Sequence, residues 1–107
     1  RCEEVRPCIG CNLCADDQLS YNRHIRCSCN AVLGNGGKID YTMEPAAVIK
    51  KVLVVGGGIA GMEAARTAAR RGHKVTLVEQ KDHLGGQLDY AVAPPYKDNL
   101  KSAVSLL

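Results

Sequence analysis

Residues 51–61 read KVLVVGGGIAG, and this stretch decides the fold of the chain. Its first five residues form an apolar, β-branched run, which is typical of a strand buried on both faces of a parallel sheet. The Ala-rich residues 62–71 are followed by a glycine, as expected for a helix with a glycine just past its last turn. Residues 74–79 supply a second strand. Residues 51–79 are therefore predicted to form one right-handed β-α-β unit of about the usual 30 residues.

The glycines between the first strand and the helix follow a G-x-G-x-x-G pattern. In this pattern the first glycine permits the tight turn, the second lets the backbone approach a pyrophosphate, and the third lets helix and strand pack closely. The start of the helix adds unpaired N–H groups and the positive end of its dipole. The predicted phosphate-binding residues are Gly56, Gly58, Ile59, Ala60 and Gly61.

Glu79 ends the second predicted strand, 23 residues after Gly56. A carboxylate at this place accepts hydrogen bonds from both ribose hydroxyls of an adenosine and repels a 2′-phosphate. The position therefore favours FAD or NAD over NADP, although Lys81 nearby leaves NADP open. The alternative reading is a glycine turn and a surface glutamate that bind no ligand.

Cysteines dominate the first part of the chain. Four of them, Cys8, Cys11, Cys14 and Cys27, follow a C-x2-C-x2-C-x12-C pattern. Thiolates bind the irons of a [4Fe–4S] cluster, one at each corner, whereas structural zinc sites usually present two separated pairs of ligands. The spacing favours the cluster, with zinc or oxidised and free thiols as the alternatives. Cys29 stands close enough to replace Cys27 as a ligand.

Apolar residues are dense only in the second half of the chain, which therefore has to hold the core. We expect two parts: residues 1–45, a [4Fe–4S]-binding segment and linker, and residues 46–107, the incomplete N-terminal part of an FAD-binding domain. A bound cluster would order the first part, since metal–thiolate bonds contribute to folding free energy. The predicted fold class is α/β, with a cysteine-rich iron–sulfur loop before a partial Rossmann-like β-α-β unit that binds FAD or NAD(P). Residues 96–107 have the composition of a helix.

Composition excludes several classes of protein. The net charge of +3 arises from 14 basic and 11 acidic residues that alternate along the chain, and all of the few aromatic residues are Tyr, so nothing indicates nucleic-acid binding. No apolar run approaches the roughly 18 residues that span a bilayer. Clustered cysteines beside a nucleotide-binding pattern, without a signal peptide, indicate a reducing cytoplasm. Because the chain starts at Arg1 and stops inside a predicted helix, we expect it to be cut from something longer.

Taken in order, these motifs resemble the iron–sulfur flavoenzymes that include 2,4-dienoyl-CoA reductase, trimethylamine dehydrogenase and related NADH:flavin oxidoreductases. The resemblance covers nearly the whole chain. It rests on RPCIGCN at residues 6–12 with the two later cysteines, on KVLVVGGG at 51–58 with GMEAA at 61–65, and on LGGQL at 84–88. Ile59 and Ala31 stand where the family commonly has Pro, and neither position supplies a ligand or a phosphate contact.

The resemblance implies an architecture and further site residues. Family members have an N-terminal TIM barrel that binds FMN and the substrate, then the cluster segment, then FAD- and NAD(P)-binding domains. This chain resembles only the middle, so FMN and NAD(P)H are expected on parts that it lacks. In the family, the LGGQL loop lies against the bound dinucleotide. Gly86 and Gln87 of this loop, with Gln80 beside the predicted ribose-binding glutamate, complete the predicted cofactor-binding residues.

The leading hypothesis is that the chain is the electron-transfer portion of an NAD(P)H-dependent iron–sulfur flavin oxidoreductase. It would relay electrons between FAD and an FMN-bearing barrel, as a fragment or subunit without a substrate site. No catalytic residue is predicted, since no Ser-His-Asp or paired-carboxylate arrangement is present. Its partner would be the remainder of the same enzyme. The alternatives are a separate electron carrier that docks to a partner flavoprotein and a zinc-stabilised nucleotide-binding module.

Overall fold

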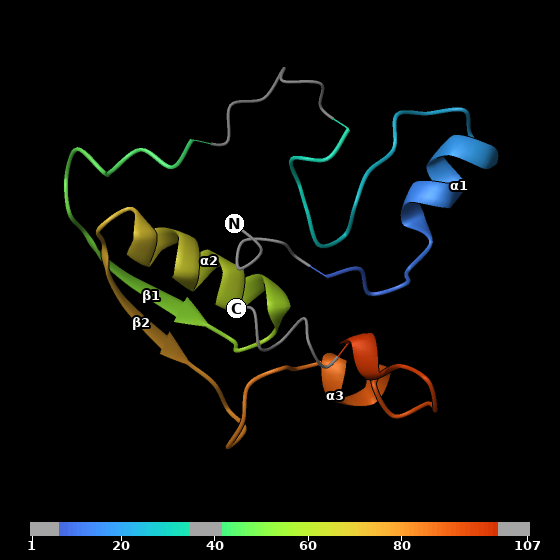
Figure 1. Ribbon diagram of the computed structural model, residues 1–107. Helices are drawn as coiled ribbons and strands as arrows, with labels where there is room; N and C mark the ends of the chain where they lie inside the picture. The colour runs from blue at the N-terminus through green and yellow to red at the C-terminus, as the bar shows by residue number, and fades with distance from the viewer. Residues whose placement is uncertain (1–6, 35–41, 101–107) are drawn as a thin grey trace. The chain divides into compact units, whose positions relative to one another are not determined.

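The computed structural model describes residues 7–34 and 42–100, and the chain divides into two compact units, Arg1–Thr42 and Met43–Leu107. In the first unit, the helix α1 spans Leu13–Leu19. The second unit holds the strands β1 (Lys51–Val55) and β2 (Lys74–Val78) and the helices α2 (Ile59–Arg70) and α3 (Leu88–Ala91). The trace of both units is drawn in Figure 1.

The second unit is built on the predicted β-α-β unit. β1 and β2 pair in parallel, with Lys51 opposite Lys74 and Val55 opposite Val78. Between them α2 runs back along one face of the two strands (Figure 1). The small mixed α/β fold with a two-stranded parallel sheet is therefore confirmed, and it is consistent with part of a Rossmann-like domain.

Helix α2 starts earlier than the sequence indicates. The predicted helix begins at Met62, but the N–H of Met62 donates to the carbonyl of Gly58 at 2.9 Å, which makes Ile59 the first helical residue. The predicted end is confirmed. Gly72 has φ +91°, and the N–H groups of Gly72 and His73 donate to the carbonyls of Ala69 and Ala68 at 2.9 and 3.1 Å. This pair of bonds is a Schellman motif, which a left-handed glycine closes at low cost.

The two faces of the sheet differ. Val54 faces α2, because its Cγ1 lies 3.5 Å from the place of a β-carbon on Gly61. On the alternate positions, Leu53 and Val55 are 64% and 78% exposed. The expectation of strands buried on both faces is therefore not met in the described residues. α2 covers one face, and the described part of this chain supplies no second layer for the other.

Other predictions differ in detail. The cysteine-rich loop of residues 1–20 contains the seven-residue helix α1, which follows Asn12 in the left-handed conformation at φ 59°. The short helix α3 begins at the last residue of the LGGQL segment, and no element is predicted from the sequence between that segment and residue 96. Of the predicted final helix, residues 101–107 lie outside the described residues.

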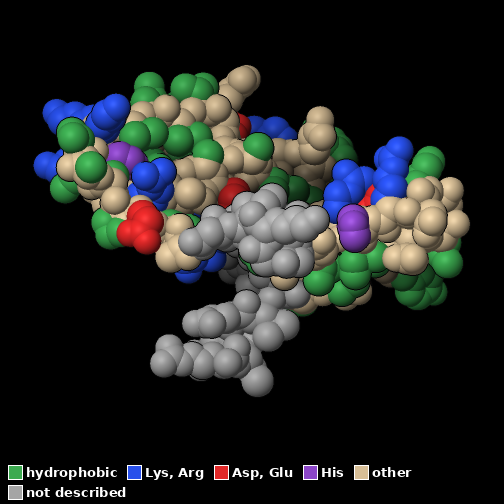
Figure 2. Space-filling model, turned by 90° about the horizontal axis from the view of Figure 1, so that it is seen from above, with side chains coloured by type: hydrophobic (Ala, Val, Ile, Leu, Met, Phe, Trp, Pro, Cys, Tyr) green, Lys and Arg blue, Asp and Glu red, His purple; other side chains and the backbone are tan. Residues whose placement is uncertain are grey.

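Few side chains are buried. In the described residues, the buried apolar side chains are Met62 and Leu88, at 6% and 7% exposure, and both belong to the second unit. The first unit buries Asp17 instead. Green apolar side chains are scattered over the face shown in Figure 2, and several large ones are exposed. No helix in the described ranges is long and apolar enough to cross a membrane.

Candidate functional site

The phosphate loop, residues 56–61, joins β1 to α2. Its first glycine, Gly56, has φ +102°, a backbone conformation that residues with a β-carbon rarely adopt. A β-carbon on the third glycine, Gly61, would lie 1.9 Å from the carbonyl oxygen of Gly56. Both positions are therefore restricted to glycine by the backbone itself, the first by its dihedral angle and the third by the close approach of α2 to the loop.

The middle glycine of the motif is different. Gly58 caps the N-terminus of α2 with φ −73° and ψ 178°, which any residue can adopt. A β-carbon on Gly58 would meet no atom within 4 Å. Nothing in the protein's own packing requires glycine there. The space beside the Gly58 backbone is open, so a ligand can approach the main chain there.

The start of α2 offers hydrogen-bond donors to that space. No side chain caps the helix, and the first intrahelical bond is donated by Met62. The N–H groups of Ile59, Ala60 and Gly61 precede that bond, in the first turn, where N–H groups have no partner within the helix. Such a turn binds phosphate well, because its N–H groups and the helix dipole favour negative charge.

Glu79 follows β2 and turns back onto the phosphate loop. Its carboxylate accepts hydrogen bonds from the N–H of Gly57 and, at 3.0 Å, from the N–H of Lys81. The Lys81 and Gly57 bonds hold the pKa of Glu79 below its usual value, so the group is ionised at neutral pH. A carboxylate has about four lone-pair positions. Two backbone donors therefore leave acceptor positions for ribose hydroxyls.

A second loop, residues 84–87, lies against the phosphate loop. Gly85 forms a parallel β-bridge with Gly58, and its N–H donates to the carbonyl of Gly57 at 2.9 Å. Gly86 has φ +59°, and a β-carbon there would lie 3.1 Å from the Cα of Gly58. Gln87 is exposed and caps α3. The structure thus brings Gly86 beside the predicted phosphate-binding residues.

Gln80 is exposed next to Glu79, and its backbone N–H contributes to lowering the pKa of that carboxylate. The structure therefore places the predicted cofactor-binding residues in the phosphate loop, at the end of β2 and in the loop before α3.

A charged cluster beside this loop was not found from the sequence. The two ring nitrogens of His83 lie 2.6 Å from Asp82 Oδ1 and 3.0 Å from Asp89 Oδ2. The Nζ of Lys81 also lies 3.4 Å from Asp89 Oδ2. Hydrogen bonds that the ring donates to the carboxylates of Asp82 and Asp89 raise the pKa of His83. The charged residues KDH are adjacent in the sequence at 81–83. Lys81 and His83 reach Asp89 only because the chain turns back between residues 83 and 89, and the sequence pattern does not indicate this turn.

The predicted metal ligands belong to the first unit. Cys8, Cys11 and Cys14 are exposed thiols, and Cys27 is half-buried. The N–H of Gly10 donates to the Sγ of Cys8 at 3.4 Å. Within residues 7–34 and 42–100, no group of three or more His, Cys, Asp or Glu side chains is arranged to hold a metal ion. The structure therefore does not gather the four thiols into one ligand shell.

The two cysteine-bearing segments are nevertheless joined. The Sγ of Cys11 lies 3.2 Å from the Oγ of Ser28, the residue after Cys27. The hydrogen bond with Ser28, followed by one from the backbone of Leu13, lowers the pKa of the Cys11 thiol. Four thiols are the donor set of a [4Fe–4S] cluster. The residues fit such a cluster in chemistry, on two segments that touch.

An ion pair with a buried carboxylate forms the second link between these segments, and no pattern in the sequence indicates it. Asp17 in α1 accepts two hydrogen bonds from Arg26, from Nε at 2.8 Å and from Nη2 at 2.7 Å. The side chain of Asp17 is only 2% exposed. The pKa of Asp17 lies below its usual value, mainly because Arg26 donates hydrogen bonds to the carboxylate.

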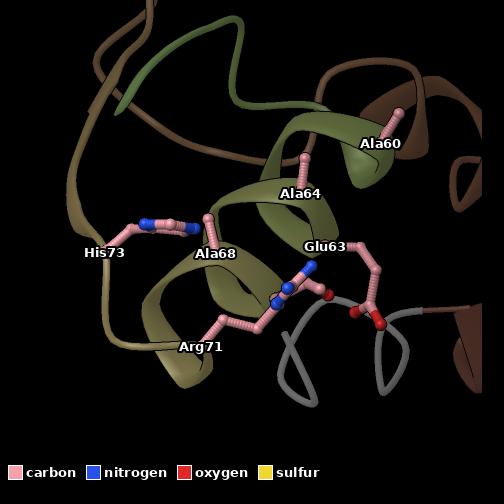
Figure 3. Close-up of a pocket in the computed structure, with 7 residues that line it drawn as sticks. Ala60, Glu63, Ala64, Ala68, Arg71 and His73 are labelled. Atoms are coloured by element: carbon pink, nitrogen blue, oxygen red, sulfur yellow. The ribbon is translucent and has the colours of Figure 1, made fainter. Parts of the chain in front are cut away.

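A shallow hollow of about 480 Å³ lies along α2 (Figure 3). Ala60, Ala64 and Ala68 follow one side of the helix there, with His73 beside Ala68. Among the lining residues, Ala60 alone is a predicted cofactor-binding residue. The N–H of Lys50 donates to Nδ1 of His73 at 3.2 Å, so His73 holds the segment before β1. The hollow does not coincide with the phosphate loop.

Comparison with known proteins gives consistent matches. The family model described as FAD dependent oxidoreductase matches residues 51–105. NADH oxidase from Thermoanaerobacter brockii is 50% identical over 102 residues, which are 94% of this chain and 16% of that protein. Cinnamate reductase from Clostridium sporogenes is 43% identical over 102 residues, 95% of this chain and 15% of that protein.

Solved structures agree with these sequence matches. The structure of a 2-naphthoyl-CoA reductase in complex with 2-naphthoyl-CoA superposes with a TM-score of 0.86 at 37% identity. The match covers 99% of this chain and 16% of that one. The chain therefore spans about one-sixth of the length of the relatives that it matches.

Proposed function

The chain belongs to the family of FAD-dependent oxidoreductases, and we propose that it forms the electron-transfer part of an NAD(P)H-dependent iron–sulfur flavin oxidoreductase. The matches to NADH oxidase and cinnamate reductase confirm the family resemblance inferred from the motifs. Because the chain spans 16% of the NADH oxidase, we propose that a larger enzyme supplies the substrate site, the FMN-binding barrel and the rest of the FAD and NAD(P) domains.

One observation carries the FAD half of the proposal. The backbone at Gly58 faces open space at the N-terminus of α2, where the chain's own packing leaves room for a β-carbon. A pyrophosphate in that space would accept hydrogen bonds from the N–H groups of Ile59, Ala60 and Gly61. Gly56 and Gly61 keep the loop tight, so that these donors face one point.

The remaining cofactor contacts follow from the surroundings of that space. Glu79 would accept hydrogen bonds from the ribose hydroxyls of the adenosine. The two backbone N–H groups that the carboxylate already accepts fix its direction. Gly86 lies against Gly58 from the second loop, and we expect Gln87 and Gln80 to complete the contacts. A carboxylate there disfavours a 2′-phosphate, which supports FAD at this loop.

For the cysteine-bearing part, residues 1–45, we propose Cys8, Cys11, Cys14 and Cys27 as the ligands of a [4Fe–4S] cluster. When bound, such a cluster supplies single-electron transfer between flavins, which handle two electrons. The protein's own contribution is hydrogen bonding to the sulfurs, from the N–H of Gly10 to Cys8 and between Ser28 and Cys11. Hydrogen bonds to ligand sulfurs adjust reduction potential. Thiol ligands of this kind suit the reducing cytoplasm.

The test uses the full-length protein, purified without oxygen. We expect one FAD per chain together with iron and sulfide. The Gly58→Ala variant fills the open space with a methyl group, so FAD content should fall, while iron content and the unfolding temperature of the FAD-free protein stay at wild-type values. One zinc per chain in place of iron would replace the cluster assignment with a structural zinc site. Unchanged FAD affinity in Gly58→Ala would contradict the phosphate site.

A further inference from the structure

We propose that the ion pair between Asp17 and Arg26 is a positioning device that holds Cys27 against the segment bearing the other three thiols. The inference rests on the proposed cluster site, and it assigns a role to two residues that bind no metal. Asp17 lies in α1, three residues after Cys14, and Arg26 directly precedes Cys27. Each partner of the ion pair therefore stands next to one predicted ligand, on either side of the gap between the segments.

The geometry of the pair restricts rotation as well as distance. Two nitrogens of one guanidinium donate to the two oxygens of one carboxylate, at 2.8 and 2.7 Å. A planar fork bound at two points fixes the relative orientation of the groups, which a single ammonium contact does not. The carbonyl of Asp17 also accepts the N–H of Arg23 at 2.7 Å. The segment that leads to Cys27 is thus anchored to α1 by side chain and backbone.

The burial of the Asp17 carboxylate is unusual for this part of the chain, since its partner Arg26 keeps 62% of its side chain exposed. Asp17 is the buried residue of the described part of the first unit, whereas the buried apolar side chains, Met62 and Leu88, both lie in the second unit. A buried carboxylate costs free energy unless it is paired and hydrogen-bonded. An apolar pair would fill the same space without that cost. The exposed guanidinium stays accessible to water, so we expect this half-buried pair to contribute orientation more than stability.

The same anchored segment places a hydrogen-bonding group on a ligand. Ser28 follows Cys27, and its Oγ lies 3.2 Å from the Sγ of Cys11. The backbone that Arg26 holds therefore presents a thiol and, one residue later, a hydroxyl that contacts another thiol. Loss of the anchor should disturb both.

The first experiment compares two adjacent carboxylates of α1. Asp17→Asn removes the charge that Arg26 binds, and Asp16→Asn makes the same change at an exposed residue. In the full-length protein, prepared without oxygen, iron loss to a chelator should be about tenfold faster in Asp17→Asn, since partners behind metal ligands commonly change metal affinity by 10 to 100 times. Asp16→Asn should match the wild type. FAD content reports that the second unit stays folded. Equal rates in both variants overturn the inference.

A second variant separates positioning from charge balance. Arg26→Lys keeps a positive charge beside Asp17 but loses the two-point contact. Positioning predicts faster iron loss and altered electron paramagnetic resonance of the reduced cluster in Arg26→Lys. Wild-type iron loss and wild-type spectra in Arg26→Lys would show that a positive charge beside Asp17 is enough without the two-point contact. That result would overturn the inference.

A third readout does not need the cluster. The metal-free full-length protein is treated with a short reagent that bridges two thiols. The reagent should join Cys11 to Cys27 or to Cys29, the residues on either side of Ser28. Mass spectrometry of the linked peptides identifies the products. The yield should fall in Asp17→Asn and stay unchanged in Asp16→Asn. A wild-type protein without iron would refute the cluster, and the cross-linking would still decide the positioning role. Equal yields in both variants count against it.

Discussion

The two units of this chain are ordered by different means. Among the described residues, the first buries a carboxylate that is paired with Arg26, and the second buries Met62 and Leu88 and packs helix against strand through glycines. An apolar contact and a close backbone approach persist without a ligand. An ion pair and four thiols leave a segment that, under the proposed cluster assignment, would gain most of its order when the metal group binds. We therefore expect one part to be shaped by packing and the other by ligation.

The two candidate sites show the same contrast. In the second unit the phosphate loop already has its turn, its donors and the Glu79 carboxylate in place. In the first unit the thiols lie on two joined segments without forming a ligand shell in the described residues. A site whose donors are already in place binds its ligand with little further ordering of the chain. A site whose metal-binding side chains come together only on binding uses part of the binding free energy to fold the segment.

Removing metal from the full-length protein is the change with the largest expected effect. A chelator should strongly lower the hydrogen-exchange protection of residues 7–34, because metal–thiolate bonds would account for most of their order, and the pairing of Asp17 with Arg26 should retain the remainder. Residues 51–79 should keep their protection and their FAD. Mass spectrometry of exchanged peptides measures both in one experiment. Equal loss in the two units, or no loss in either, would remove the contrast.

The Gly61→Ala substitution tests the part shaped by packing. The new β-carbon would lie 1.9 Å from the carbonyl oxygen of Gly56, so α2 has to move away from the loop. We expect a loss of about 3 kcal/mol in unfolding free energy, at the upper end of the usual cost of overpacking. Denaturant unfolding of the FAD-free protein provides the measurement, so that a change in FAD affinity does not enter the comparison.

The matched control for that substitution is Gly58→Ala, which adds the same methyl group where no atom lies within 4 Å. Its effect on unfolding free energy should stay within about 0.5 kcal/mol, as at ordinary surface positions. Similar losses in the two variants would show that the loop is not held by the close approach at Gly61.

Glu79→Gln should weaken FAD binding about tenfold, since it removes a charged acceptor from the ribose position. It should also change stability in acid. Backbone donors from Lys81 and Gly57 lower the pKa of Glu79 in the folded protein. The ionised group therefore contributes stability that is fully present above its ordinary pKa and is lost as pH falls through the lowered value.

Thermal unfolding between about pH 7 and 3, around the ordinary glutamate pKa of about 4.3, measures this effect. In Glu79→Gln that part of the acid dependence should disappear. The control is Glu63→Gln, which breaks a 3.2 Å ion pair with Arg66 on the surface of α2. Retention of the full acid dependence in Glu79→Gln would show that another group causes it.

The smallest expected effect concerns His83. Both ring nitrogens face carboxylates, so the protonated ring donates two hydrogen bonds and the neutral ring only one. Because the folded protein raises the pKa of His83, its contribution is present below the ordinary histidine value and is lost as pH rises through the raised value.

FAD dissociation from the full-length protein should therefore quicken about twofold between pH 6 and 9, an effect of the size expected for an exposed ion pair. His83→Gln should remove this dependence, and His24→Gln, in the first unit, should keep it. A pH profile unchanged by His83→Gln would mean that the loop at residues 84–87 is held by its backbone contacts alone.

Local patterns in the sequence predict the second unit well. The strand at residues 51–55, the parallel partner strand and the glycine that ends α2 follow from periodicity and from the backbone angles that only glycine adopts easily. The start of α2 was placed three residues late, because the hydrogen bond from Met62 to Gly58 is a feature of the turn and not of side-chain composition. Burial of the strands depends on neighbours that the described residues do not include.

The sequence by itself determined the β-α-β order, the phosphate loop, the cysteine spacing and the family. Each of these depends on residues close together along the chain, or on the steric limits of single positions. Only the tertiary structure decided that Glu79 accepts the N–H of Gly57, that Gly85 bridges to Gly58 and that Asp17 binds Arg26. These contacts join residues that are 9 to 27 positions apart. Their formation depends on how the turns between them fold, which no local pattern specifies.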